Sequence, residues 1–393
     1  MLDPIVILGA ARTPMGAFQG EFASLSANDL GGAAIRAAVE RSGIAPEKID
    51  EVLFGNCLMA GQGQAPARQA GFKGGLPAST GAVTLSKMCG SGMQATLLAH
   101  DQLVAGSRDV MVAGGMESMT NAPYLLPKAR GGMRIGHDRI FDHMMLDGLE
   151  DAYEPGRSMG TFGEDCAAKY GFTREEQDAF ATASVQRAKT AMASGAFAAE
   201  ITPVTIKGRS GDTVISSDEG PGKVKLDKIP SLKPAFKKDG TITAASSSSI
   251  SDGAAALVLS RESTAKELGA APLARIVGHA TFSQAPEWFS TAPVGAVQKL
   301  LKKIGWDVKG VDLWEINEAF AVVPMAAMKE LDISHDIVNV NGGACALGHP
   351  IGASGARIIV TLIHALKARG LKKGVATLCI GGGEATALAI EVL

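Results

Sequence analysis

The chain has 393 residues, of which 46% are hydrophobic and 20% charged, and its formal net charge is −2. This composition is that of a globular protein, and the length suffices for roughly two or three domains with full cores. The near-neutral charge argues against nucleic acid or a membrane surface as partner, and no apolar run approaches the ~18 residues that span a bilayer. Five cysteines are a sparse, odd count, which favours reduced thiols in a cytoplasmic protein.

Strand and helix patterns alternate in the first part of the chain. Residues 4–11, 49–56, 82–89 and 109–115 read as strands, and residues 29–41 have helical spacing. Because the strands are almost continuously apolar, they predict a mostly parallel sheet that is covered on both faces.

The regular alternation breaks in the middle of the chain. Residues 117–172 have little periodicity and are too many for a plain connection, which indicates a functional segment or an oligomer contact. A capping box of Thr173 and Glu176 then opens a strongly predicted helix. Residues 207–240 are again loop-like and basic. Residues 120–250 therefore look inserted into an α/β body.

Regular α/β order returns near residue 254 and continues to the end of the chain. The strands predicted there are 274–280, 311–316, 337–341, 374–380 and 386–393.

Two segments, residues 89–115 and 352–383, repeat one pattern. Each has a Ser-Gly pair, then an apolar helical run, a short turn, a buried strand and a Gly-Gly turn. The pairs are Ser91-Gly92 and Ser354-Gly355. A repeat of this length predicts two copies of one α/β unit packed as a pseudo-dimer, with a site shared between them.

Cys89 lies between a predicted strand and a predicted helix. A cysteine at a helix N-terminus meets free N–H groups and the positive end of the helix dipole, and both favour the nucleophilic thiolate. The alternative is a buried structural cysteine, the usual state of an isolated Cys.

Three further residues have reactive side chains in glycine-rich or strand-end settings. His349 precedes Pro350, so its backbone is extended, and it is placed to act as a base or an oxyanion donor rather than as a core histidine. Cys379 precedes a triple glycine at 381–383, whose N–H groups can form an anion hole, although a core cysteine is the simpler interpretation. Asn317 is either an ordinary helix N-cap or part of a site.

The remaining candidates are weaker. Lys223, Lys225 and Lys228 belong to the basic loop and indicate either a solvated surface or a binding site for phosphate groups. The seven histidines are scattered and no cysteine pair has ligand spacing, so we expect no metal site. A glycine-rich phosphate loop is missing after the first strand, which disfavours a nicotinamide enzyme.

Four segments together resemble the thiolases, and their order and spacing run through the chain from residue 4 to residue 393. They are Met-Cys-Gly-Ser-Gly at 88–92, Asn-Glu-Ala-Phe at 317–320, Gly-Gly-Ala-Cys-Ala-Leu-Gly-His-Pro-Ile-Gly at 342–352, and Cys-Ile-Gly-Gly-Gly at 379–383.

The resemblance implies an α/β duplicated thiolase fold, with two mixed five-stranded sheets, covering helices and an inserted loop domain. The N-terminal half would comprise residues 1–119 and 251–271, and the C-terminal half residues 272–393. Residues 120–250 would form the loop domain for coenzyme A binding and oligomer contacts.

The resemblance also implies two-step acyl transfer with coenzyme A. Cys89 would be the nucleophile that carries the acyl group, and His349 would take its proton. Asn317 would hold the water that completes one oxyanion hole, and the N–H groups of Cys89 and Gly381 would form the other. Cys379 would exchange a proton with the acetyl methyl group.

By the same likeness, acyl-coenzyme A and coenzyme A are substrates and products, with short-chain compounds such as acetoacetyl-coenzyme A expected, and no separate cofactor. The family comprises enzymes of fatty acid metabolism, and the protein would be a homo-oligomer, either a dimer or a tetramer. The coenzyme A site would comprise Ser248, Met159, Phe236 and Phe320, with its phosphates near Lys223, Lys225 and Lys228.

The chain departs from the family pattern in three places. Ser158, where many members have His, and the loop 286–293 bear on acyl length, and the serine-rich loop 246–251 departs from the pattern of the coenzyme A loop. Two rival functions stay open. A ketoacyl carrier-protein synthase would pair its cysteine with two histidines, and a non-catalytic acyl-coenzyme A binding homologue would not need an intact Cys89, His349 and Cys379.

Overall fold

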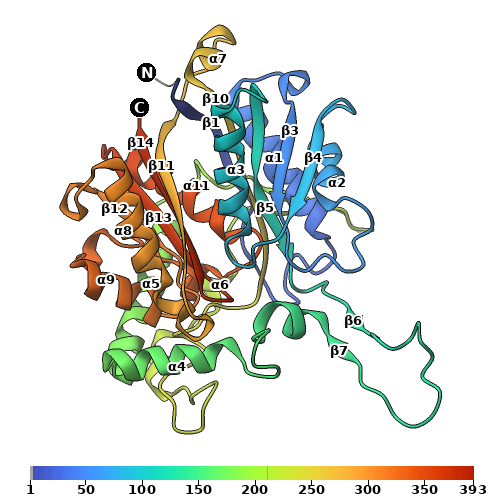
Figure 1. Ribbon diagram of the computed structural model, residues 1–393, viewed down its shortest axis with the longest axis vertical. Helices are drawn as coiled ribbons and strands as arrows, with labels where there is room; N and C mark the ends of the chain where they lie inside the picture. The colour runs from blue at the N-terminus through green and yellow to red at the C-terminus, as the bar shows by residue number, and fades with distance from the viewer. Residues whose placement is uncertain (1–2, 210) are drawn as a thin grey trace.

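The computed structural model describes residues 3–209 and 211–393. Its centre is a ten-stranded mixed sheet with strand order β12-β13-β14-β11-β1-β10-β5-β3-β4, and the short β2 pairs with β10 (Figure 1). These strands are β1 (Ile5–Arg12), β2 (Gly16–Ala17), β3 (Glu51–Gly55), β4 (Gly81–Leu85), β5 (Val110–Ser118), β10 (Ser251–Arg261), β11 (Ala274–Ser283), β12 (Leu313–Ile316), β13 (Lys373–Ile380) and β14 (Glu384–Val392).

The sheet consists of two halves that meet edge to edge. Strands β4, β3, β5, β10 and β1 form the N-terminal half, and β11, β14, β13 and β12 form the C-terminal half. Between the halves, β1 and β11 pair only through Val6 with Arg275 and Ile7 with Ala274. The α/β class is therefore as predicted, whereas the two separate five-stranded sheets are corrected to one sheet with a short junction.

The strand predicted at residues 337–341 is wrong. Val338 makes only an isolated bridge to Trp314. The reason lies in Asn339, whose backbone has φ +48°. Its side-chain amide accepts from the N–H of Ile316 and donates to the C=O of Ile316, each at 2.8 Å. The Asn339 side chain thus occupies the backbone groups of β12 that a further strand would pair.

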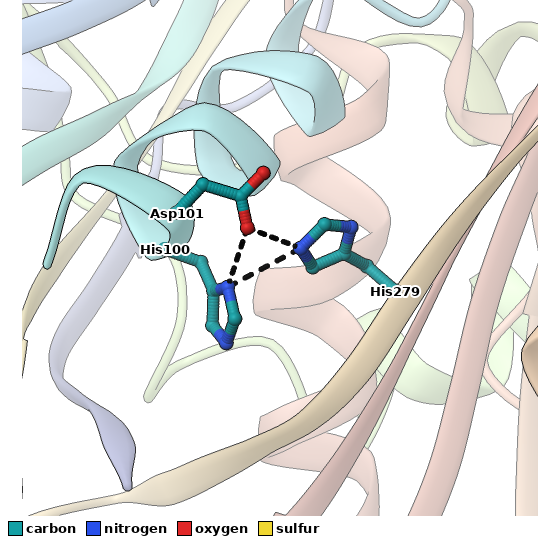
Figure 2. Close-up of side chains that lie close together, drawn as sticks. All are labelled: His100, Asp101 and His279. Carbon is teal, nitrogen blue, oxygen red and sulfur yellow. Dashed lines mark hydrogen bonds and ion pairs between the residues drawn. The ribbon is translucent and has the colours of Figure 1, made fainter. Parts of the chain in front are cut away.

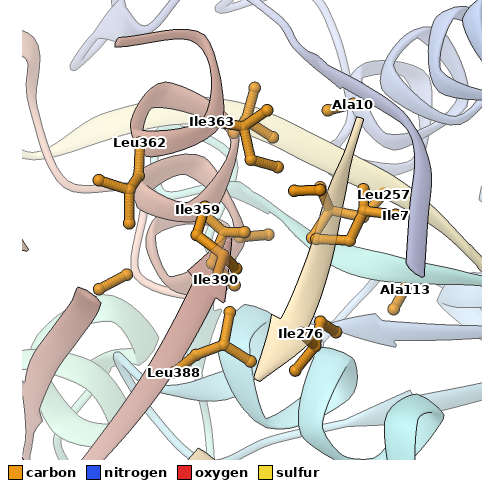
Figure 3. Packing of buried hydrophobic residues seen from close by; sticks show 14 of the residues in the cluster. Ile7, Ala10, Ala113, Leu257, Ile276, Ile359, Leu362, Ile363, Leu388 and Ile390 are labelled. Carbon is orange, nitrogen blue, oxygen red and sulfur yellow. The ribbon is translucent and has the colours of Figure 1, made fainter. Parts of the chain in front are cut away.

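Helices cover both faces of each half-sheet, and the strand residues alternate between these faces. Val6 and Leu8 of β1 pack with the first two helices, whereas Ile5 and Ile7 join a core that also holds Leu388 of β14 (Figure 3). The helices of the two halves are α1 (Ala27–Ser42), α2 (Pro66–Lys73), α3 (Ser91–Val104), α7 (Glu262–Glu267), α8 (Ala292–Ile304), α9 (Val322–Leu331), α10 (Ala344–Leu347) and α11 (Ser354–Ala368).

The central helices α3 and α11 begin with the repeated Ser-Gly pairs, and their first turns touch. A Cβ on Gly92 would lie 2.9 Å from the backbone N of Ala356, and one on Gly355 would lie 2.4 Å from the N of Met93. Real Cβ atoms do not approach so closely, so only glycine permits this contact. The repeat therefore brings Cys89, before α3, toward His349, before α11.

The described residues between 120 and 250 contribute no strand to the ten-stranded sheet. The predicted capping box of Thr173 and Glu176 is present at the start of α5. The elements of this segment are β6 (Tyr124–Leu125), β7 (Phe141–Asp142), η2 (Met145–Leu149), α4 (Met159–Tyr170), α5 (Arg174–Ala193), β8 (Val204–Ile206), β9 (Thr213–Ile215), α6 (Gly220–Lys223) and η3 (Leu226–Ser231). Across the described ranges, no helix combines the length and apolarity that crossing a bilayer requires.

Candidate active site

Cys89 lies in a tight turn between β4 and α3. The preceding residue, Met88, has φ +45°, a left-handed conformation that is unusual for a residue with a side chain. The following residue, Gly90, lies against β13, since a Cβ there would be 2.3 Å from Cδ1 of Ile380. The turn from the N-terminal half is thus pressed against the strand that carries Cys379 in the C-terminal half.

Burial decides the protonation of Cys89. Desolvation raises the pKa of its thiol to about 11, although hydrogen bonds from the backbone N–H groups of Gly381 and Cys89 act in the opposite direction. The sequence argument that the helix N-terminus favours a thiolate is therefore wrong for the resting site. The thiol needs a base, and the same two N–H groups face the sulfur, where a thioester oxygen would form.

His349 has the properties of that base. Its Nδ1 lies 2.5 Å from Ser354 Oγ, and the Ser354 hydroxyl donates to the C=O of Pro350 at 2.9 Å. The hydroxyl proton is thereby used, so Nδ1 must carry the imidazole proton and Nε2 is an acceptor. Among the described residues Nε2 is buried without a hydrogen-bond partner. Burial lowers the pKa of His349 to about 3, so the ring is neutral at physiological pH.

This low pKa predicts a flat pH profile for acetylation of Cys89 by acetyl-coenzyme A. An imidazole that stays neutral accepts a proton equally well from about pH 8 down to about pH 5, whereas an ordinary histidine loses that ability near pH 6.5. Stopped-flow release of coenzyme A measures the loading rate. An inflection near pH 6.5 that disappears in His349→Asn would show that the ring titrates normally.

Cys379 and Asn317 are both buried near the end of β13, where the N–H of Asn317 donates to the C=O of Thr377 at 3.1 Å. Cys379 is the last residue but one of β13 and has no exposed surface, and desolvation, with a further contribution from the charge of nearby Cys89, raises its pKa well above the usual range. Asn317 is 1% exposed, and both atoms of its amide are without hydrogen-bond partners among the described residues. The helix N-cap alternative for Asn317 is wrong, because α9 begins at Val322 with Ala321 as its cap.

Backbone hydrogen bonds join two of the sequence motifs to the loop 246–251. The N–H of Ser248 donates to Ala319 at 3.0 Å, and the N–H of Ala321 donates to Ser246 at 2.8 Å. The N–H of His349 donates to the C=O of Ser249 at 3.2 Å. The serine-rich loop, although it departs from the family pattern, therefore joins the Asn-Glu-Ala-Phe and His-Pro segments.

A cavity of about 430 Å³ opens beside His349. Four residues predicted to bind coenzyme A lie on its wall, namely Ser248, Met159, Phe236 and Phe320. Ser158, one of the three departures from the family pattern, lines it as well. Its remaining described walls are mostly apolar and include Met119, Met145, Leu149 and Ile351.

The three candidate lysines are not brought to this cavity. Lys223 and Lys228 form ion pairs with Glu219 at 2.5 Å and Asp227 at 3.7 Å. Lys225 is exposed and makes no ion pair among the described residues. The structure thus brings together the predicted catalytic residues and the apolar part of the predicted coenzyme A site, and leaves the lysines on the exposed surface.

Two buried glutamates that the sequence analysis passed over hold the site loops. Glu117 accepts from the N–H groups of Cys57 and Gly352, both at 2.9 Å, and burial raises its pKa to about 7. Glu318 accepts from the N–H of Cys345 at 3.0 Å and from the Asn339 amide at 2.8 Å. The available signal was the position of Glu318 within the Asn-Glu-Ala-Phe segment and of Glu117 just after the apolar run 109–115, because a buried acid requires buried donors.

Comparison with known proteins identifies the family of the chain over almost its full length. The family model described as "Thiolase, N-terminal domain" matches residues 5–263, and "Thiolase, C-terminal domain" matches residues 270–392. A probable acetyl-CoA acetyltransferase of Dictyostelium discoideum is 49% identical over 393 residues, which cover 100% of this chain and 95% of the relative. An acetyl-CoA acetyltransferase of Chromobacterium violaceum is 49% identical over 389 residues, which cover 98% and 99% of the two chains.

Solved structures give the same result. The acetyl-CoA acetyltransferase of Bacillus anthracis superposes with a TM-score of 0.97 at 43% identity, covering 100% of this chain and 99% of that chain. The Acat5 thiolase of Ascaris suum, solved in complex with coenzyme A, has a TM-score of 0.93 at 42% identity, with coverages of 99% and 100%. The resemblance and the thiolase fold are confirmed, and the chain belongs to the thiolase family.

Proposed function

We propose that the protein is an acyltransferase, an acetyl-CoA C-acetyltransferase of the thiolase family. It joins two molecules of acetyl-coenzyme A into acetoacetyl-coenzyme A and free coenzyme A, or runs the reverse thiolysis. The observation that carries this proposal is the buried, neutral His349, whose Nε2 has no hydrogen-bond partner among the described residues and whose side chain lines the cavity. The Cys89 thiol needs a proton acceptor to become a nucleophile, and the unpartnered Nε2 of a neutral imidazole supplies one.

The first half-reaction loads the enzyme. His349 Nε2 takes the proton of the Cys89 thiol, and the sulfur attacks the acetyl carbonyl of acetyl-coenzyme A. The oxygen of the tetrahedral intermediate accepts hydrogen bonds from the N–H groups of Cys89 and Gly381. The carbon–sulfur bond to coenzyme A then breaks, and the leaving thiolate takes a proton from Cys379, so that Cys379 becomes a thiolate and His349 keeps its proton on Nε2. Acetyl-Cys89 and free coenzyme A are the products.

The second half-reaction forms the carbon–carbon bond. Cys379 acts as the base that removes a proton from the methyl group of a second acetyl-coenzyme A, whose thioester oxygen is held by His349 and by a water on Asn317. The resulting carbanion attacks the acetyl carbonyl on Cys89. Acetoacetyl-coenzyme A leaves, the Cys89 sulfur recovers its proton from His349 Nε2, and Cys379 retains the proton taken from the methyl group. Two oxyanion sites are needed because each half-reaction develops negative charge on a different oxygen.

The direct test is release of acetyl-coenzyme A from acetoacetyl-coenzyme A and coenzyme A, compared with longer 3-ketoacyl-coenzyme A substrates. We expect turnover with acetoacetyl-coenzyme A. A ketoacyl carrier-protein synthase would instead require an acyl carrier protein, and a non-catalytic homologue would bind coenzyme A without turnover. Either result would contradict the proposal. No separate cofactor is expected in the assay.

We also retain the lysines of the inserted segment as a binding site for the coenzyme A phosphates. Lys225→Glu is expected to raise the Michaelis constant for coenzyme A several-fold, roughly 3- to 10-fold, with little change in turnover, because a reversed charge weakens ground-state binding of phosphate. Steady-state thiolysis kinetics measure both constants. Lys48→Glu, an exposed lysine of the N-terminal half, is the matched control. Equal constants for the two variants would place the phosphates elsewhere.

We further propose a homo-oligomer, a dimer or a tetramer, located in the cytoplasm and acting in fatty acid metabolism. The segment that carries β6 and β7 projects from the body of the molecule (Figure 1). Three large apolar residues on it are exposed: Ile135 at 97%, Tyr124 at 69% and Ile140 at 63%. Such exposure is typical of a contact surface. Light scattering of the wild type and of Ile135→Asp tests it, and a monomer in both would contradict it.

A further inference from the structure

His100, Asp101 and His279 form a cluster outside the cavity and the cysteine turn. His100 and Asp101 lie near the end of α3, and His279 lies on β11, so the cluster spans the two halves of the fold (Figure 2). The side chains of His100 and His279 are largely buried, at 18% and 12% exposure, whereas that of Asp101 is 58% exposed. His100 is nine residues beyond the start of α3, about 14 Å along the helix axis from Ser91.

Three donor atoms of these residues are directed toward a common point. Asp101 Oδ1 lies 3.1 Å from His100 Nδ1 and 2.9 Å from His279 Nε2, and the two nitrogens are 3.2 Å apart (Figure 2). The atoms therefore form a nearly equilateral triangle. The imidazole rings are almost perpendicular, at 83°, with their centroids 4.8 Å apart.

This triangle matches one face of a tetrahedral metal site. Zinc binds imidazole nitrogen and carboxylate oxygen at about 2.0–2.1 Å, which places neighbouring tetrahedral ligand atoms about 3.3 Å apart. The observed separations are shorter than that value by a few tenths of an ångström at most. Small rotations of the side chains would increase them to that value. Two imidazoles with one carboxylate are also a ligand set that suits zinc, nickel, copper or iron ions.

We propose that His100, Asp101 and His279 bind a divalent transition-metal ion such as Zn²⁺, which ties α3 of the N-terminal half to β11 of the C-terminal half. The exposed side of Asp101 leaves the fourth position to water. The site is structural in this proposal and independent of acyl transfer. The sequence analysis expects no metal site because ligand-spacing patterns require neighbours along the chain, and here 179 residues separate the two histidines.

The charges around the cluster set the expected strength of binding. Asp101 supplies one negative charge to a dication, and Lys303 lies close by, with its Nζ 3.3 Å from the backbone oxygen of His279. The lysine opposes the bound cation. The site is therefore expected to be weaker than a closed four-ligand site, and its occupancy to depend on free metal concentration.

Zinc titration of the full-length protein tests the proposal. Isothermal titration calorimetry measures affinity and stoichiometry, and thermal unfolding measures the rise in Tm that a ligand of the folded state produces. His279→Gln and Asp101→Asn are each expected to weaken binding at least ~10-fold, because loss of even an outer-shell partner commonly has an effect of this size. His137→Gln, an exposed histidine outside the cluster, should leave affinity and Tm rise unchanged. Asp101→Asn changes an exposed side chain without changing its shape, so it should not disturb the fold. Weaker binding in this variant therefore could not be explained by a folding defect of the kind that could affect His279→Gln.

The reactive cysteines could also bind zinc, and cobalt distinguishes the two sites. Co²⁺ held by His100, Asp101 and His279 should absorb without a thiolate-to-metal charge-transfer band, and this spectrum should persist in Cys89→Ala. The proposal fails if zinc affinity is the same in the wild type, His279→Gln and Asp101→Asn. It also fails if all bound cobalt shows the thiolate band, or if the wild type binds neither metal.

Discussion

Replacing Cys89 with alanine is expected to abolish acetyl transfer in both directions, with a loss in kcat of at least roughly 10⁴-fold. No other group at the site can carry the acetyl chain, since Cys379 is fully buried and its burial holds it as a thiol. Coupled assays of condensation and of thiolysis measure the loss.

The fold should survive this change. Removing one sulfur from a partly exposed turn leaves the α3 and α11 contact intact, so Tm and coenzyme A binding should stay near the wild-type values. Activity that remains within about 10-fold of the wild type would reject Cys89 as the nucleophile.

Cys379→Ser is expected to reduce condensation at least ~100-fold while acetyl loading of Cys89 continues. A hydroxyl is a far weaker acid than a thiol, so it cannot exchange a proton with the acetyl methyl group at a useful rate. Stopped-flow loading and steady-state condensation, measured on the same preparation, separate the two steps.

Cys166→Ser is the matched control for this variant. Cys166 is buried in the same apolar cluster as Cys379 and contributes no reacting group to the proposed mechanism. It should lose some stability and leave the ratio of condensation to loading unchanged. Equal losses in loading and condensation for Cys379→Ser would show that the Cys379 thiol has a structural role and does not exchange a proton with the acetyl methyl group.

Much of the fold could be predicted because local patterns and tertiary packing agree. The apolar strands β1, β5 and β13 are buried on both faces, and the repeated Ser-Gly pairs identify the helix ends that touch at the centre. The predicted strand at 337–341 failed because one side chain, Asn339, replaced the backbone pairing that its apolar neighbours suggested. Propensity cannot detect such a substitution, since it depends on which backbone groups lie nearby.

The candidate site, like the fold, could be predicted from the sequence only in part. Motif order pointed to Cys89, His349 and Cys379, and the packing of glycines explains how distant segments reach one place. Their protonation could not be predicted, because it depends on burial: desolvation of the Cys89 thiol outweighs the hydrogen bonds from the backbone N–H groups of Gly381 and Cys89. The tautomer of His349 likewise depends on Ser354, a hydroxyl that the sequence indicates only as part of a repeat.

Basic composition alone did not predict where Lys223, Lys225 and Lys228 lie relative to the cavity. The basic residues are close to the serine-rich loop along the chain, and the sequence analysis inferred a phosphate site from that closeness. In the structure Lys223 and Lys228 instead form ion pairs with neighbouring acids on the exposed surface. Surface ion pairs of this kind contribute little free energy and exchange readily. The kinetic comparison of Lys225→Glu with Lys48→Glu therefore tests whether the coenzyme A phosphates bind at these lysines.

Peptide mass spectrometry of the protein mixed with acetyl-coenzyme A tests the central claim most directly. Mixing is followed by rapid acid quenching and proteolysis, so that a thioester survives to be mapped. The account predicts one acetyl group on the peptide that contains Cys89, its loss on addition of coenzyme A, and its absence in Cys89→Ala. An acetyl group on another residue, or no adduct in a preparation that still catalyses thiolysis, would contradict it.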